Sequence, residues 1–290
     1  MIMRWPSALA FLAPALLLYG LFTLLPAVLG VQLSLTDSTG VGLSHFVGLA
    51  NFARMIHDPQ ALIALRNIIV YVVFVTIVQN ALGLAFAVAL ARTPRVRGAL
   101  RVALLAPSML SALIVGFVWS AIYSPLGGAL NELLKVAGLG ALTRTWLGDP
   151  TTALFAVGFV NVWMFAGYST AIWLAGYLSI PQEIQDSAAM DGAGAWHRFW
   201  QIEWPMLAPA ATVNLTLTFI GAAKVFDLPF VMTKGGPDDA TQVPGLLIYQ
   251  NAFAGYRFGY AAALALVFAL IILLASGVQS SLLRAREERL

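Results

Sequence analysis

The sequence predicts an all-α polytopic membrane protein with six transmembrane helices and one loop that projects on the cytoplasmic side. Two observations predict this class. The chain has 290 residues, of which 60% are hydrophobic and only 10% are charged, whereas a soluble domain carries roughly 25% charged residues. The charged residues are also separated by long uncharged runs, at 5–36, 67–91, 102–131, 150–182, 204–223 and 258–283.

Each uncharged run reaches the length of about 20 residues that a helix needs to cross a hydrocarbon core of about 30 Å. The backbone must satisfy its own hydrogen bonds in lipid, so we expect the runs to be helical. The expected spans lie roughly at 8–34, 67–91, 102–123, 152–178, 206–231 and 260–283, within a single transmembrane domain over 1–290. We expect the first span to be retained, because it is longer than the apolar core of about 7–15 residues in a signal peptide.

Positively charged residues orient these spans. The loop after the second span, ARTPRVRGALR, contains four arginines and no acidic residue. Cytoplasmic loops of membrane proteins carry an excess of lysine and arginine. We therefore expect a multi-pass protein with both termini, and the loop at 179–205 between spans four and five, on the cytoplasmic side.

The loop at 179–205 contains the polar stretch DSAAMDGAGAWHRFWQIEWP. Ser179 and Gln182 fit a capping box at the start of a short helix. Gly192 fits the left-handed position that ends such a helix, and a second helix then places Trp196 and Trp200 on one face. By its residues alone, this stretch is either a solvated amphipathic loop or a rigid projection that docks on a soluble partner.

The spacing of this stretch resembles the EAA loop of bacterial ABC-importer permeases. That pattern is Glu-Ala-Ala, three residues, Gly, nine residues, Ile, one residue and Leu-Pro. The matching positions here are Asp186-Ser187-Ala188, Gly192, Ile202 and Trp204-Pro205. Asp replaces Glu, Ser replaces Ala and Trp replaces Leu; the shorter Asp keeps the charge but changes the placement of any ion pair to a partner.

Other segments resemble the maltose-type carbohydrate-uptake branch of these permeases, in its compact six-span form. They are FVGLANF at 46–52, VFDLPFVMTKGGPDDAT at 225–241 and NAFAGYRFGYAAALA at 251–265. The resemblance covers roughly residues 10–285 and implies a permease subunit in the bacterial inner membrane that forms half of a carbohydrate path. It also implies as partners a second, unlike permease, two copies of an ABC ATPase and an extracytoplasmic solute-binding protein.

The resemblance further implies that the loop is a coupling helix that docks on the ATPase. The residues that carry this role are Asp186, Ser187, Ala188, Asp191, Gly192, Ile202 and Pro205. The chain itself has no G-x-x-x-x-G-K-[ST] phosphate loop. We therefore expect no catalytic residue and no bound cofactor in this chain, with ATP and magnesium held by the partner ATPase.

Other function classes are disfavoured. The chain has no cysteine, and of its three histidines two lie on the outer side and one on the inner side, so we expect no metal site and no membrane enzyme. Its basic residues are scattered, which argues against nucleic-acid binding. The alternative is a secondary transporter that an ion gradient drives, but such a protein needs carboxylates or broken helices near mid-membrane, and no Asp or Glu lies at that depth.

Polar residues inside the spans are the candidates for a substrate path, because uncharged polar and aromatic groups suit sugars. They are Asn161, Trp163, Tyr168, Asn214, Thr216, Thr218, Lys224 and Asp227. The alternative for the Asn and Thr residues is hydrogen bonding between helices, and for Lys224 and Asp227 it is a mutual salt bridge. The sequence does not identify the substrate, which could be a sugar, an oligosaccharide or a polyol phosphate.

Overall fold

The structure is a computed structural model that describes residues 5–93, 95 and 97–287. Within these residues every regular element is a helix, and an isolated β-bridge joins Thr36 to Phe46. Five of the helices are long and apolar enough to cross a membrane, and a bent helix pair brings the number to six if it counts as one span. The expected all-α membrane class is therefore confirmed. The chain divides into two compact units, 1–61 with 247–270 and 62–246 with 271–290.

The first unit contains α1 (Trp5–Tyr19), which continues through a π turn at Gly20–Leu24 into α2 (Leu25–Ser34). These helices form the apolar segment Leu12–Ser34, which contains a window of 18 residues with no buried member. The unit also contains α3 (Ala50–Ile56), the π turn at Gln250–Ala254 and the start of α15 (Phe258–Glu287).

Side chains of this unit pin the loop that follows α2. The amide of Asn51 donates to the carbonyl oxygens of Ser34 and Thr36, both at 2.8 Å. On α15, the Tyr260 hydroxyl donates to the Asp58 carboxylate, and the Arg54 guanidinium lies 4.8 Å from the centre of the Tyr260 ring. The Asn51 contacts therefore hold the start of the loop, and the Tyr260 contacts attach α3 and the turn after it to α15.

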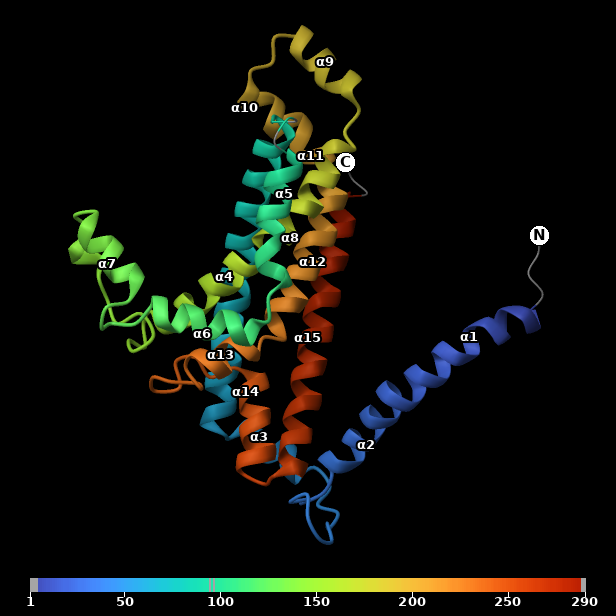
Figure 1. Ribbon diagram of the computed structural model, residues 1–290. Helices are drawn as coiled ribbons and strands as arrows, with labels where there is room; N and C mark the ends of the chain where they lie inside the picture. Colours follow the sequence, from blue (N-terminus) through green and yellow to red (C-terminus); the bar gives the residue numbers. More distant parts are fainter. Residues whose placement is uncertain (1–4, 94, 96, 288–290) are drawn as a thin grey trace. The chain divides into compact units, whose positions relative to one another are not determined.

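The second unit is a helical bundle that contains most of α4 (Pro59–Ala91), together with α5 (Arg97–Leu105), α8 (Ala153–Leu178) and α12 (Ala208–Ala223), as Figure 1 shows. α5 and α12 both pack against α8. Two groups of buried apolar side chains fill the bundle, one around Tyr71 and Val157 and the other around Trp173 and Leu207. Arg97 donates to the last carbonyl oxygens of α4, those of Leu90 at 3.1 Å and Ala91 at 2.9 Å. It therefore caps that helix end.

The expected third span is a bent pair instead of one straight helix. α5 continues into a 3-10 turn at Ala106–Met109, and α6 (Ala112–Ile122) then runs at 95° to it. Pro107 interrupts the helical hydrogen bonds at this point, and α6 packs against α13 (Asp227–Met232). After α6 come the amphipathic α7 (Ala129–Val136) and a 3-10 turn at Gly140–Leu142. The short α14 (Pro244–Tyr249) follows α13 along the chain.

The polar loop after α8 contains α9 (Gln182–Met190), α10 (Ala195–Arg198), a π turn at Phe199–Glu203 and α11 (Trp204–Met206). Figure 1 shows α9 and α10 beyond the end of α8. Gly192 has φ +74°, so the prediction of a left-handed glycine between two short helices is confirmed. The predicted capping box is wrong, because the Ser179 hydroxyl donates back to Gly176 O at 2.7 Å.

Candidate functional site

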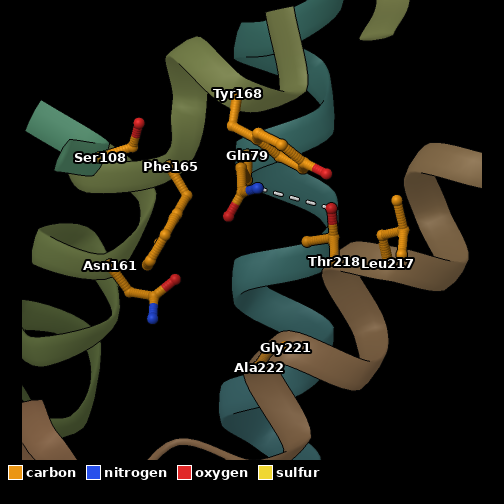
Figure 2. A pocket seen from close by; sticks show the side chains of 9 residues that line it. All are labelled: Gln79, Ser108, Asn161, Phe165, Tyr168, Leu217, Thr218, Gly221 and Ala222. Carbon is orange, nitrogen blue, oxygen red and sulfur yellow. Dashed lines mark hydrogen bonds between the residues drawn. The ribbon is translucent and has the colours of Figure 1, made fainter. Parts of the chain in front are cut away.

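A cavity of about 360 Å³ lies in the second unit, among α4, α8, α12 and the turn after α5. Figure 2 shows its lining side chains, which are Gln79, Ser108, Asn161, Phe165, Tyr168, Leu217, Thr218, Gly221 and Ala222. None of these residues is charged. The cavity therefore combines a mainly apolar surface with several uncharged polar side chains.

Helical spacing brings the lining residues together. On α8, Asn161, Phe165 and Tyr168 lie at positions i, i+4 and i+7, so they share one face of the helix. On α12, Thr218 and Gly221 are three residues apart. Gly221 has no neighbouring atom within 4 Å of the position where a β-carbon would stand, so its missing side chain leaves room in the cavity.

The polar atoms of the lining can donate and accept hydrogen bonds without any net charge. Gln79 Nε2 donates to Thr218 Oγ1 at 3.4 Å, a long contact that leaves the Gln79 carbonyl oxygen available. Asn161 is buried, whereas Tyr168 is 47% exposed and therefore reaches the open side of the cavity. Amide and hydroxyl groups beside the Phe165 ring suit a ligand that combines hydroxyl groups with an apolar face.

Three of the path residues that the sequence predicts line this cavity, namely Asn161, Tyr168 and Thr218. The others do not. The Trp163 ring packs against Trp119, with ring centres 5.5 Å apart. Lys224 and Asp227 are exposed, and in the described part of the chain no ion pair joins them. The Thr216 hydroxyl is buried outside the cavity and has no hydrogen-bond partner.

Asn214 connects two helices instead of lining the cavity. Its side-chain amide donates to Ser169 on α8, at 2.7 Å to the hydroxyl and 3.2 Å to the carbonyl oxygen. Opposite Ser169 on α4 lies Gly83, where a β-carbon would stand 2.7 Å from the Ser169 hydroxyl oxygen. Asn214 therefore forms hydrogen bonds between two helices, which is the alternative role that the sequence left open for it.

Sequence reasoning missed Gln79, Ser108 and Phe165. Gln79 carried a usable signal, since an amide side chain in the apolar run 67–91 is costly in lipid unless it faces a cavity or a partner. Ser108 gave a weaker signal, because it lies beside the bend between α5 and α6, and the sequence did not predict that bend.

The predicted coupling residues lie on or beside the polar loop. Asp186, Ser187, Asp191 and Gly192 are exposed, Ala188 is buried, and Ile202 and Pro205 are partly buried. Gln182 Nε2 donates to Asp186 Oδ1 at 3.0 Å. The chain turns at Gly192, where Ala193 N donates to Ala188 O at 3.0 Å. The loop thus presents two acidic side chains, Asp186 and Asp191, around a buried alanine.

The acidic and histidine side chains of the described residues are scattered. Within the described part of the chain they form no group of three or more that could hold a metal ion.

Comparison with known proteins gives consistent matches. Residues 79–287 match the family described as binding-protein-dependent transport system inner membrane component. A probable ABC transporter permease of Pyrococcus horikoshii is 34% identical over 269 residues, which cover 92% of each chain. A probable starch degradation products transport system permease of Thermoanaerobacterium thermosulfurigenes is 31% identical and covers 96% of this chain and 94% of its own. A trehalose/maltose transport system permease of Thermococcus litoralis is 33% identical, with 89% and 88% covered.

Solved structures share the fold. A crystal structure of a bacterial ABC transporter that imports the acidic polysaccharide alginate matches with a TM-score of 0.82 at 21% identity, over 95% of this chain and 94% of that chain. A second structure of a bacterial alginate ABC transporter, in complex with a periplasmic protein bound to alginate pentasaccharide, matches with a TM-score of 0.83 at 21% identity, over 96% of this chain and 94% of that chain.

Proposed function

Because the chain belongs to the family of binding-protein-dependent transport system inner membrane components, we propose that it forms half of the translocation path for a neutral carbohydrate. It is a permease subunit of the ABC type, as its relatives are. The observation that carries the carbohydrate proposal is the uncharged cavity that Gln79, Asn161, Tyr168 and Thr218 line. The alternative of a transporter driven by an ion gradient has no support from this family.

The lining favours a neutral substrate over a charged one. Hydroxyl groups of a sugar can exchange hydrogen bonds with the Asn161 amide and the Tyr168 hydroxyl, and one face of the sugar ring can stack on Phe165. A phosphate or carboxylate in the same place would lose its water without a cation to pair with, which is strongly unfavourable. The relatives include permeases named for starch degradation products and trehalose/maltose, and one named for sn-glycerol-3-phosphate. The neutral cavity favours the sugars.

We further propose that energy enters through the loop at 179–205. In this proposal Asp186, Ser187, Ala188, Asp191, Gly192, Ile202 and Pro205 form the surface that docks on one of two ABC ATPase subunits. ATP and magnesium are bound there and not by this chain. The exposed acidic residues and the turn at Gly192, with φ +74°, support a rigid projection.

The remaining partners and the orientation belong to the same proposal. A second, unlike permease completes the path, and an extracytoplasmic solute-binding protein delivers the substrate, as the family description implies. The four arginines of the segment 92–101 support an orientation in which this loop, both termini and the loop at 179–205 face the cytoplasm.

Uptake by single-site variants tests the cavity. Complexes in proteoliposomes are given labelled maltose, trehalose and maltotriose, with sn-glycerol-3-phosphate as the anionic contrast. Asn161→Ala and Tyr168→Phe each remove a hydrogen bond to the substrate, so we expect sugar uptake to fall by about 3- to 10-fold. Tyr256→Phe is the matched control, because Tyr256 is exposed and does not line the cavity. Wild-type uptake in both cavity variants, or a preference for sn-glycerol-3-phosphate, would refute the proposal.

Cross-linking tests the docking surface. The chain has no cysteine, so Asp186→Cys introduces a single thiol on the exposed face of α9. We expect this thiol to capture the ATPase subunit in an assembled complex, whereas a thiol at exposed Glu132 on α7 should not capture it. Failure of the Asp186 thiol to reach the ATPase in an intact complex would contradict the assignment.

A further inference from the structure

Four tryptophan rings form a continuous row from the polar loop into the bundle. Trp196 contacts Trp200, with ring centres 5.6 Å apart, and Trp200 contacts Trp204 at 5.9 Å. Trp204 in turn stacks on Trp173 of α8 at 6.1 Å, with ring planes 27° apart. The first ring is 77% exposed and the last is 2% exposed. The row therefore connects the surface of the loop to the core of α8.

A buried ion pair runs beside this row. Arg198 Nε donates to Glu203 Oε1 at 3.1 Å, and the Glu203 side chain is completely buried. Glu203 is the one buried acidic or basic residue among those whose exposure the structure describes. A buried carboxylate is unfavourable unless it is paired, so this pair holds its part of the loop in one geometry.

The π turn at Phe199–Glu203 makes this pair possible. Arg198 and Glu203 are five residues apart, whereas an α-helix places neighbours on one face at three or four residues. A π turn, with its hydrogen bonds from residue i to i+5, brings residues five apart onto the same side. Such a turn is a local irregularity that frequently lies at functional sites.

Further contacts attach both features to the bundle. The Arg286 guanidinium of α15 lies 5.3 Å from the centre of the Trp204 ring. The Tyr177 side chain, on the last turn of α8, lies beside Glu203. These contacts attach Glu203 to α8 and Trp204 to α15.

We propose that Arg198, Glu203, Trp204 and Trp173 form a rigid joint that passes displacement of the loop to α8, the helix that carries Asn161 and Tyr168. Glu203 and Trp204 are then positioning residues for transport: neither lines the cavity, and neither is among the residues assigned to docking. This inference rests on the proposed coupling function of the loop. Its physical basis is that buried, tightly packed contacts have few alternative arrangements and therefore move as one body.

The test is the number of sugar molecules imported per ATP hydrolysed, measured in proteoliposomes that contain the complete importer. The variant Glu203→Gln keeps the size of the side chain but removes the charge that binds Arg198. We expect the complex to assemble and to hydrolyse ATP, while sugar import per ATP falls by about 3- to 10-fold. Glu132→Gln is the matched control, because Glu132 forms an exposed pair with Lys135 at 2.8 Å on α7.

A second variant covers the case in which Glu203→Gln does not assemble. Trp204→Leu keeps an apolar side chain but removes the stacking on Trp173 and the contact with Arg286. We expect the same fall in import per ATP. A role in folding alone would lower assembly, import and hydrolysis together and leave the ratio at its wild-type value in the complexes that form.

The outcomes separate the two proposals. A wild-type ratio in every assembled variant overturns the joint and leaves the proposed function intact. A wild-type complex that neither hydrolyses ATP nor imports maltose, trehalose or maltotriose overturns the proposed function, and the joint with it. A lowered ratio in Glu203→Gln or Trp204→Leu, with Glu132→Gln at the wild-type value, supports the joint.

Discussion

Gly167→Ala should destabilise the bundle more than its single added methyl group suggests. Gly167 faces α5, where a β-carbon would stand 1.8 Å from the carbonyl oxygen of Leu104. The closest approach that real β-carbons show is about 3.0 Å, so the two helices must separate by 1.2 Å. The atom in the way belongs to the backbone, which means that no side-chain rotation can relieve the contact.

The expected magnitude follows from two opposing effects. Replacing glycine by alanine inside a helix stabilises it by up to about 1 kcal/mol, whereas overpacking a core destabilises it by about 1–3 kcal/mol and occasionally more. A clash with the backbone belongs at the upper end of that range, so we expect a net loss of about 2 kcal/mol. A loss of 1 kcal/mol lowers the unfolding temperature by about 2 °C in a chain of about 250 residues, so we expect a fall of roughly 4 °C.

Thermal unfolding of the purified complex in nanodiscs measures this effect, with two matched glycines as references. At Gly158 the β-carbon would meet the Phe74 ring at 2.9 Å, a side chain that can shift, so Gly158→Ala should lower the unfolding temperature less. At Gly221 the space is empty, so Gly221→Ala should leave it equal or slightly higher. An unfolding temperature of Gly167→Ala within 1 °C of that of Gly221→Ala, on the order of what a neutral change gives, would refute the packing argument.

Two further predictions follow from the neighbouring contacts. Asn214→Ala removes the amide that donates to Ser169 and leaves the buried Ser169 hydroxyl without that donor, so we expect a loss of about 1–3 kcal/mol in stability. Thermal unfolding measures this loss, with the cavity variant Asn161→Ala as the reference. Equal stability of the two variants would show that Asn214 does not connect the helices. Gly221→Leu fills part of the cavity of about 360 Å³. It should therefore lower sugar uptake while the unfolding temperature stays near the wild-type value. Unchanged uptake would show that the substrate path lies elsewhere.

The sequence predicted the class of the fold because lipid imposes a simple requirement. A span must be apolar and helical over its full length, and that requirement is visible in composition. The bend between α5 and α6 was not predictable in the same way. The run 102–131 is uncharged on both sides of the bend, and the direction of α6 depends on its packing against α13, which no local pattern reveals.

The candidate site was predicted in part for a similar reason. Polar residues are rare in the spans, so Asn161, Tyr168 and Thr218 stood out and the structure places all three in one cavity. Asn214 stood out equally, yet its amide bonds Ser169. An amide that lines a cavity and an amide that joins two helices have the same sequence signal, and only the neighbouring helix distinguishes them.

The ion pair between Arg198 and Glu203 could not be predicted from the sequence, for a geometric reason. Spacing rules for helices compare residues three and four apart, and this pair is five apart. The residue directly after this π turn, Trp204, stacks on Trp173 of α8, a contact between distant parts of the chain that local preference alone does not predict.

The level of Gly83, Ser169 and Asn214 has a mechanical consequence for the bundle. Here α4, α8 and α12 meet so closely that α4 has no room for a methyl group at Gly83. The buried Asn214 amide of α12 also donates to Ser169 of α8, which fixes the position of these two helices along each other. The cavity lies one helical turn away, at Gln79 and Thr218. We therefore expect these helices to tilt about this level rather than to separate at it. In the proposed transport cycle, such tilting would widen the bundle on one side of this level and narrow it on the other.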